Sequence, residues 1–227
     1  MKTNKKELTI FILCAFAVPF LMMPLLHHCL QNGQDTSIYA NAQMFYPAAG
    51  VMLAFLMARR KEMPLRFFVL HLVVTAGMLL MGLLSAAMPQ AEWMGIANLV
   101  IVIASVLGWI LLLTERKDKR ERYGLRLHGK FGTALAICVY FLVVKTGMVF
   151  LGVALQGGSA WTEYLAYWKS YTPWGMALVL IPNFFLSFLP FFGEEYGWRY
   201  YLTPALQGRF GARRGALAVG VLWGLWH

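Results

Sequence analysis

Long apolar stretches alternate with short polar segments along the whole chain. Most of these stretches are close to the roughly 20 helical residues that cross a hydrocarbon core. We predict helical spans over residues 8–26, 39–58, 67–88, 94–114, 131–155 and 174–192, followed by an incomplete span from residue 215 onward. The pattern therefore predicts an all-α, polytopic transmembrane helical bundle of about seven spans, with the last one truncated.

Composition supports the same class of protein. Hydrophobic residues make up 59% of the chain and charged residues only 13%, far from the balance of an ordinary soluble domain. We divide the chain into residues 1–130, with four spans and a charged loop, and residues 131–227, which contain the candidate chemistry. Cys14, Cys29 and Cys138 form no close pair in sequence, so they indicate neither a disulfide framework nor a metal knuckle.

The net charge of +10 follows from how Lys and Arg are distributed among the loops. Eighteen of the 20 Lys and Arg residues precede the first span or follow the second, fourth and sixth spans, and loops 27–38 and 89–93 contain none. Cytoplasmic loops carry such a positive excess. We therefore expect an integral membrane protein of a bacterial plasma membrane, with a cytoplasmic N-terminus and membrane lipids as partners. No basic face with stacking aromatic residues remains, so we expect no nucleic-acid partner.

Two further features belong to the C-terminal half. The segment 157–172 is rich in Trp and Tyr, which suits a helix lying at the level of the lipid headgroups. Lys145 lies near the middle of the span 131–155, where a lysine needs a partner or a watery cavity. It could pair with a glutamate of the candidate site, or its long side chain could reach the interface from a tilted helix.

Candidate chemistry follows directly after the sixth apolar stretch, where Glu194, Glu195 and Arg199 lie close together. A charged residue within a membrane span costs about 3 kcal/mol on insertion scales, so these residues are functional candidates. Glu195 and Arg199 can pair on one helical face, whereas Glu194 is rotated by about 100°, points elsewhere and could remain free. A free glutamate in a low-dielectric setting suits a general base that takes a proton from water. A salt bridge at the helix end, with Arg199 anchoring headgroups, explains the pair equally well.

His227 is the second candidate group. It lies in an apolar segment that has no other ionisable residue after Arg214, and it follows Glu194 by 33 positions. This separation is enough for a turn and an antiparallel return, so the two polar groups could face each other. Gly220 and Gly224 form a pair of small residues that would let the two helices approach closely.

The expected spans place these two groups at different depths. If residues 174–192 cross from the outside, Glu194 lies near the cytoplasmic interface, whereas His227 lies roughly 20 Å along the next helix at 1.5 Å per residue. A kink at Pro182 or Pro190, or a helix that starts at Glu194 and re-enters the bilayer, would bring them together. We therefore predict a break in the sixth span.

Two motifs carry a resemblance to a known family. Glu194, Glu195 and Arg199 fit Glu-Glu-x-x-x-Arg, and Trp223 and His227 fit Phe-x-x-x-His with tryptophan in place of phenylalanine. The stretch from position 193 to the end of the chain resembles the CPBP intramembrane proteases, also called the CAAX protease or Abi family. Further residues that carry the resemblance are Gly197, Trp198, Leu202, Pro204, Leu206, Gln207, Leu222 and Gly224.

The resemblance implies hydrolysis of peptide bonds inside the membrane, near its cytoplasmic side. The implied substrates are prenylated proteins with a C-terminal tripeptide, bacterial leader peptides or bacteriocin-related peptides. It assigns Glu194 and His227 to the activation of water, and Glu195 and Arg199 to shaping and neutralising the site. The family's third motif, His-x-x-x-Asn, supplies an oxyanion-stabilising or metal-binding pair and does not occur here. We therefore expect an inactive fragment of a longer protein, since a single oxyanion donor is worth about 10²–10³-fold in rate.

Metal use, oligomeric state and two other functions stay open at this stage. A catalytic zinc usually has three protein ligands and a water, and Glu194 and His227 supply two. A divalent metal such as zinc and a metal-free, glutamate-activated water are equally compatible with the sequence. The alternative functions are a non-catalytic family member that serves in immunity or as a membrane scaffold, and a transporter, which would spread ionisable residues over more spans. No pattern in the sequence indicates an oligomeric state.

Overall fold

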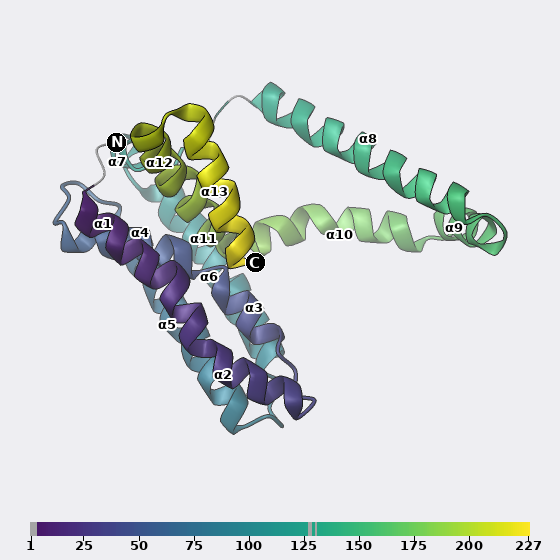
Figure 1. The fold of residues 1–227 in the computed structure, drawn as a ribbon, viewed down its shortest axis with the longest axis horizontal. Coiled ribbons are helices and arrows are strands. Elements are labelled where there is room, and N and C mark those ends of the chain that lie inside the picture. The colour runs from purple at the N-terminus through teal and green to yellow at the C-terminus, as the bar shows by residue number, and fades with distance from the viewer. Residues whose placement is uncertain (1–3, 127–128, 130) are drawn as a thin grey trace. The chain divides into compact units, whose positions relative to one another are not determined.

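The computed structural model describes residues 4–126, 129 and 131–227, and these residues are mostly helical (Figure 1). Within these ranges, five helices are long and apolar enough to cross a membrane: Lys5–Gln31, Ser37–Met57, Leu65–Ala87, Trp93–Thr114 and Leu135–Gln156. A sixth span is counted if Thr172–Leu186 and Phe188–Phe210 form one interrupted crossing. The prediction of an all-α, polytopic membrane protein is confirmed.

The described residues form two compact units, one from residues 4–124 and 185–227 and the other from those described within 125–184. The first unit begins with one helical run, which is composed of α1 (Lys5–Ile12), the π-helical η1 (Leu13–Ala17) and α2 (Val18–Gln31). Its remaining elements before the charged loop are α3 (Ser37–Gln43), α4 (Tyr46–Met57), α5 (Leu65–Ala87), α6 (Trp93–Thr114) and the short α7 (Lys117–Arg122).

A capping box starts the first helix. The Asn4 side chain accepts a hydrogen bond from the Lys6 N–H at 3.2 Å, and the Glu7 carboxylate accepts one from the Asn4 N–H at 3.4 Å. These bonds satisfy N–H groups that have no partner within the helix. The residue at which the first helix begins is therefore determined by the local sequence.

Helix α4 forms the centre of the first unit. It packs against α1, α5 and two elements of the C-terminal part, α11 and η2. Most of its residues are buried, and three consecutive small ones, Ala48, Ala49 and Gly50, lie on it. Small side chains let neighbouring helix backbones approach closely, which is how membrane helices commonly pack. The candidate site is built against this central helix.

The second unit consists of α8 (Phe131–Gln156), α9 (Ser159–Lys169) and most of α10 (Thr172–Leu186). The aromatic segment predicted as an interfacial helix is the helix α9, and the ring of Trp161 lies against Phe150 and Tyr164 with centroid distances of 5.0 and 6.1 Å. Its placement at the headgroup level stays a prediction. Lys145 lies on α8, and its pairing with a glutamate of the candidate site also stays a prediction.

The predicted break in the sixth span lies at Ser187, between the two prolines of that segment. Helix α10 ends at residue 186, and α11 (Phe188–Glu195) begins two positions later. Pro190 falls in the first turn of α11, where proline removes no intrahelical hydrogen bond. The N–H of Leu189 in the same turn donates to Oγ of Ser105 on α6 at 3.1 Å. The start of α11 after the break is thus stabilised in two ways: its proline costs no helical hydrogen bond, and a serine side chain from α6 accepts a hydrogen bond from one of its free backbone N–H groups.

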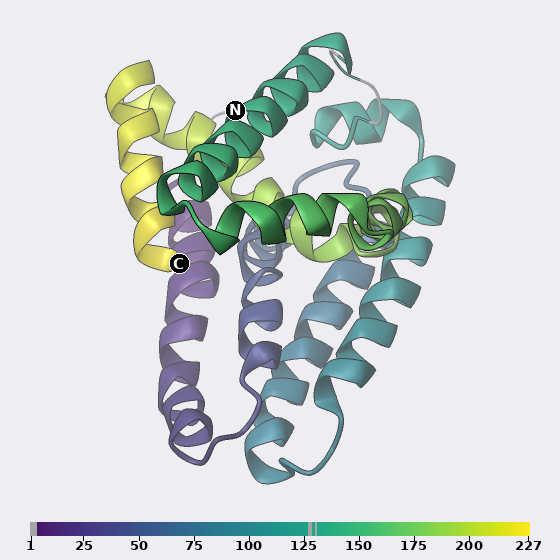
Figure 2. The same cartoon turned by 90° about the vertical axis from the view of Figure 1, so that its right-hand side faces the viewer.

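After the break the chain forms a helical hairpin. Helix α11 continues through the π-helical η2 (Tyr196–Leu202) into α12 (Thr203–Phe210), and Gly211 then turns the chain into α13 (Ala212–Trp226). Gly211 has a φ of +82°, which residues with a Cβ rarely adopt. Figure 2 shows the yellow hairpin beside the purple first span. The predicted end of the span at residue 192 is wrong, because helix continues to residue 210.

The expected seventh span corresponds to α13, which has 15 residues. Helix α13 packs closely on α12, because a Cβ added to Gly215 would lie 2.5 Å from backbone atoms of Gln207. Its described residues therefore form the return arm of a hairpin.

Glycines place the α11–η2 region directly against the backbone around α4. A Cβ added to Gly193 would lie 2.5 Å from the carbonyl oxygen of Met44, and one added to Gly197 would lie 2.7 Å from the carbonyl carbon of Pro47. Gly220 and Gly224 differ, because a Cβ on either would meet nothing within 4 Å. The prediction that this second pair permits close helix approach is therefore wrong.

We expect Gly197→Ala to lower the free energy of unfolding by about 1–3 kcal/mol, because the new methyl group would overlap the Pro47 backbone, which no side-chain rotation can relieve. Gly220→Ala on α13 is the matched control. It faces open space and is expected to raise stability by up to about 1 kcal/mol through helix propensity. Unfolding of the purified protein in one detergent measures both changes. Equal midpoints for the two variants would contradict the close packing of Gly197.

Candidate active site

Glu194 and Glu195 end helix α11 and make contacts in different directions. Oε2 of Glu195 lies 2.9 Å from Nε of Arg199, one turn further along the chain. Oε1 of Glu194 instead accepts a hydrogen bond of 2.9 Å from Nε1 of Trp223 and lies 3.5 Å from Nε2 of His227, both in the C-terminal segment. The predicted pairing of Glu195 with Arg199 is confirmed, and the four predicted site residues lie in one region.

The two carboxylates also differ in their exposure to solvent. The side chain of Glu194 is 13% exposed, whereas that of Glu195 is 51% exposed and its partner Arg199 is 60% exposed. An exposed ion pair contributes only about 0–1 kcal/mol to stability. The Glu195–Arg199 pair therefore balances charge near the site without holding the fold together, and Glu194 is the more sheltered carboxylate.

The hairpin removes the expected difference in depth between Glu194 and His227. Glu194 lies 17 positions before Gly211 and His227 lies 16 positions after it. Because helix runs on both sides of this turn, each group lies roughly 25 Å from it at 1.5 Å per residue. The two groups therefore reach the same level of the hairpin. This match depends on Glu194 lying inside a helix that continues to residue 210.

The wide turn of η2 lies directly after the glutamate pair. Trp198 in this turn is fully buried, and its ring lies edge-on to Phe11 and Trp226 with centroid distances of 5.8 and 5.4 Å. The OH of Tyr196 donates to the backbone carbonyl of Tyr123 at 2.9 Å. π-Helical turns are rare and are frequent at functional sites. Here the turn fixes the glutamate-bearing helix to the first span and to the charged loop.

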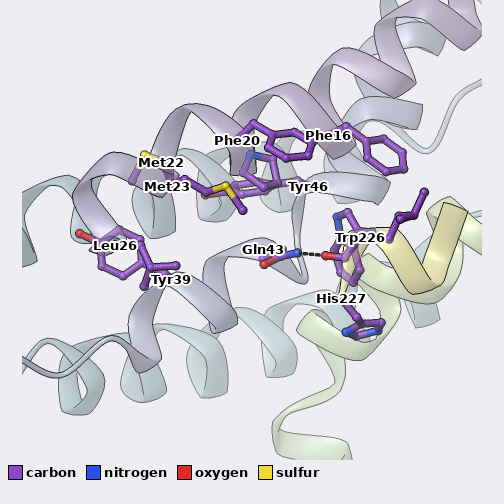
Figure 3. A pocket seen from close by; sticks show the side chains of 12 residues that line it. Phe16, Phe20, Met22, Met23, Leu26, Tyr39, Gln43, Tyr46, Trp226 and His227 are labelled. Carbon is purple, nitrogen blue, oxygen red and sulfur yellow. Dashed lines mark hydrogen bonds between the residues drawn. The ribbon is translucent and has the colours of Figure 1, made fainter. Parts of the chain in front are cut away.

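An apolar cavity of about 210 Å³ borders His227 (Figure 3). Side chains from η1, α2, α3, α4 and the end of α13 line it, among them Phe16, Phe20, Met22, Met23, Tyr46 and His227. Two hydrogen bonds fix the end of α13 beside it: Gln43 Nε2 donates to the Trp226 carbonyl at 2.7 Å, and Trp226 Nε1 donates to the Ala15 carbonyl at 2.9 Å. The site therefore offers a space for an apolar group beside the imidazole.

Three residues near the site were not identified from the sequence. The sequence indicates Trp223 only as a motif variant and gives Gln43 and His71 no role. His71 is fully buried, and its Nε2 donates to the backbone carbonyl of Phe45 at 3.2 Å. A Cβ added to Gly193 would lie 3.2 Å from its ring. A polar residue within an apolar stretch was the available signal for Gln43 and His71.

The donor set does not fit a zinc centre held by protein side chains alone. A catalytic zinc usually has three protein ligands. Glu194 and His227 are two, and no group of three or more His, Cys, Asp or Glu side chains gathers among the residues that the structure describes. The sequence leaves a divalent metal and a metal-free water equally open, and the chemistry proposed below uses the carboxylate and the imidazole.

Comparison with known proteins supports the resemblance. Residues 174–227 match the family model described as type II CAAX prenyl endopeptidase Rce1-like. CAAX prenyl protease 2 from Methanococcus maripaludis is 38% identical over 47 residues, which cover 21% of this chain and 17% of that protein. The match thus spans less than a fifth of that relative's length. No solved structure matches the chain.

Proposed function

We propose that this chain, whose residues 174–227 match the Rce1-like family, acts as an intramembrane endopeptidase of the CAAX type. One observation carries the proposal. The two halves of the C-terminal hairpin bring Glu194 Oε1 and His227 Nε2 to 3.5 Å, although the two residues are 33 positions apart. A carboxylate and an imidazole at this distance can share one water molecule, which is the nucleophile in peptide hydrolysis.

Glu194 is the proposed general base. Its carboxylate takes a proton from the water, and the water oxygen attacks the carbonyl carbon of the scissile bond. The C–N bond then breaks as the proton moves from Glu194 to the departing amine. His227 orients the water through Nε2, and its position is held by the packing of α13 on the first span. The sheltered position of Glu194 supports this role, because bulk water is partly excluded from the carboxylate.

Glu195 and Arg199 are proposed to shape the site and to neutralise it. Their ion pair places a cation and an anion side by side at 2.9 Å, one helical turn from Glu194. The pair therefore adds no net charge near the base. Of the two adjacent glutamates, Glu195 has the arginine partner, and Glu194 instead faces Trp223 and His227.

The proposed substrate is a peptide presented at the cytoplasmic face of the membrane. The apolar cavity beside His227 supports a substrate with a large apolar group near the scissile bond. By analogy with the matched relative, whose name refers to a prenyl protease, the first candidate is the C-terminal tripeptide of a prenylated protein. Leader peptides and bacteriocin-related peptides of bacteria are the second. The proposed location is the bacterial plasma membrane, with the N-terminus in the cytoplasm.

The test is cleavage of a prenylated reporter peptide by the natural full-length protein reconstituted in liposomes. We expect measurable cleavage, and a loss of at least about 100-fold in His227→Ala, because the imidazole no longer orients the water. Glu92→Gln, in the segment before α6, is the matched control and should cleave like the parent. An inactive parent over a broad panel of peptides would instead favour a non-catalytic immunity or scaffold protein.

A further inference from the structure

Trp223 contacts both members of the proposed catalytic pair. Its indole Nε1–H donates to Glu194 Oε1 at 2.9 Å, and its ring lies edge-on to the ring of His227 with a centroid distance of 4.4 Å. Trp223 is the residue that stands where the motif of the resembled family has phenylalanine. Phenylalanine could make the ring contact, but it has no N–H to donate. The hydrogen bond to the carboxylate is therefore a property of tryptophan at this position.

We propose that Trp223 is a positioning residue for Glu194, which holds one carboxylate oxygen and leaves the other to take the proton from water. Oε1 receives the indole N–H and faces His227, whereas no hydrogen bond from the described residues reaches Oε2. Fixing one oxygen sets the rotation of the whole carboxylate and so the direction of its second oxygen. The inference rests on the proposed function, because it assigns a task within the same reaction.

The bond predicts a kinetic signature that loss of packing alone does not produce. Without the indole N–H, the Glu194 carboxylate loses its fixed rotation, so the rate of the chemical step should fall while binding of the peptide stays as it is.

Trp223→Phe keeps an aromatic ring on His227 and removes only the donor. We expect kcat to fall about 10-fold with KM unchanged. Trp93→Phe is the matched control, because it also removes an indole hydrogen bond, of 2.8 Å to the Met88 carbonyl, away from the site. Its kcat and KM should equal those of the parent. A kcat that is unchanged in Trp223→Phe, or that falls equally in both variants, overturns the proposal.

A second measurement separates this inference from the proposed function. In protein labelled with ¹⁵N-tryptophan, the indole resonance of Trp223 is the one that Trp223→Phe lacks. We expect this resonance to shift in Glu194→Gln and to stay in place in Glu195→Gln. A resonance that does not shift in Glu194→Gln refutes the hydrogen bond, even in a protein that cleaves the reporter. A resonance that shifts only in Glu194→Gln, in a protein that cleaves nothing, confirms the bond and refutes the proposed function.

Discussion

Cleavage by Glu194→Gln is expected to fall about 10²–10⁴-fold below that of the parent, the usual contribution of a general acid–base group. Glutamine keeps the size of the side chain and can still accept the hydrogen bond from Trp223, but it cannot take a proton from water. Helix packing should therefore survive while the chemistry is lost. The measurement is kcat/KM on the prenylated reporter peptide in liposomes, with unfolding of each variant followed alongside.

Glu195→Gln is the matched control for this experiment, since it changes the neighbouring residue in the same way. Its carboxylate is half exposed and bound to Arg199 rather than to Trp223 and His227. We expect a loss of about tenfold or less, because an exposed pair contributes at most about 1 kcal/mol. Equal losses in the two variants would contradict the division of roles between the adjacent glutamates.

Stability is expected to depend most strongly on an ion pair far from the site in sequence. Glu7 binds Arg60 with two hydrogen bonds of 2.9 and 2.7 Å, and the Glu7 side chain is only 6% exposed. The guanidinium also lies 4.2 Å from the centroid of the Phe55 ring. Glu7→Gln should lower the free energy of unfolding by about 3 kcal/mol, because it leaves a partly buried arginine without its counter-charge. Equilibrium unfolding in one detergent measures the change.

Glu62→Gln provides the control for that prediction. Glu62 pairs with Arg122, but both side chains are about half exposed, at 49% and 54%. Water and salt screen such a pair, so its loss should cost less than about 1 kcal/mol. A similar loss of stability in both variants would show that burial does not distinguish the two ion pairs.

The membrane spans were predictable because length and apolar character are local properties of a sequence. Predicted spans over residues 39–58, 67–88 and 94–114 lie within two residues of the helices Ser37–Met57, Leu65–Ala87 and Trp93–Thr114 at each end. The region after residue 192 was predicted less well. Its arginines suggested a cytoplasmic loop, whereas the chain continues as helix to residue 210. Arginine has a high helix propensity, so its presence does not end a helix.

The site was predictable where its contacts are local, and less so where they cross the fold. Glu195 and Arg199 are one helical turn apart, so their pairing follows from helix geometry alone. The donation from Trp223 to Glu194 joins positions 29 apart, and the bond from Gln43 to Trp226 joins positions 183 apart. No periodicity or local spacing indicates such contacts, because they depend on how distant helices pack.

By itself, the sequence determined the class of protein and the identity of the polar groups, since the lengths of apolar stretches and the spacing of motif residues are local properties of the chain. Only the tertiary structure decided that Glu194 and His227 meet. The turn at Gly211 places them at nearly equal distances along two arms of a hairpin. The close approach that positions this hairpin uses Gly193 and Gly197, whose missing side chains leave room for the backbone leading into α4. A glycine's neighbours in space, rather than its spacing in the sequence, determine whether it permits such contact.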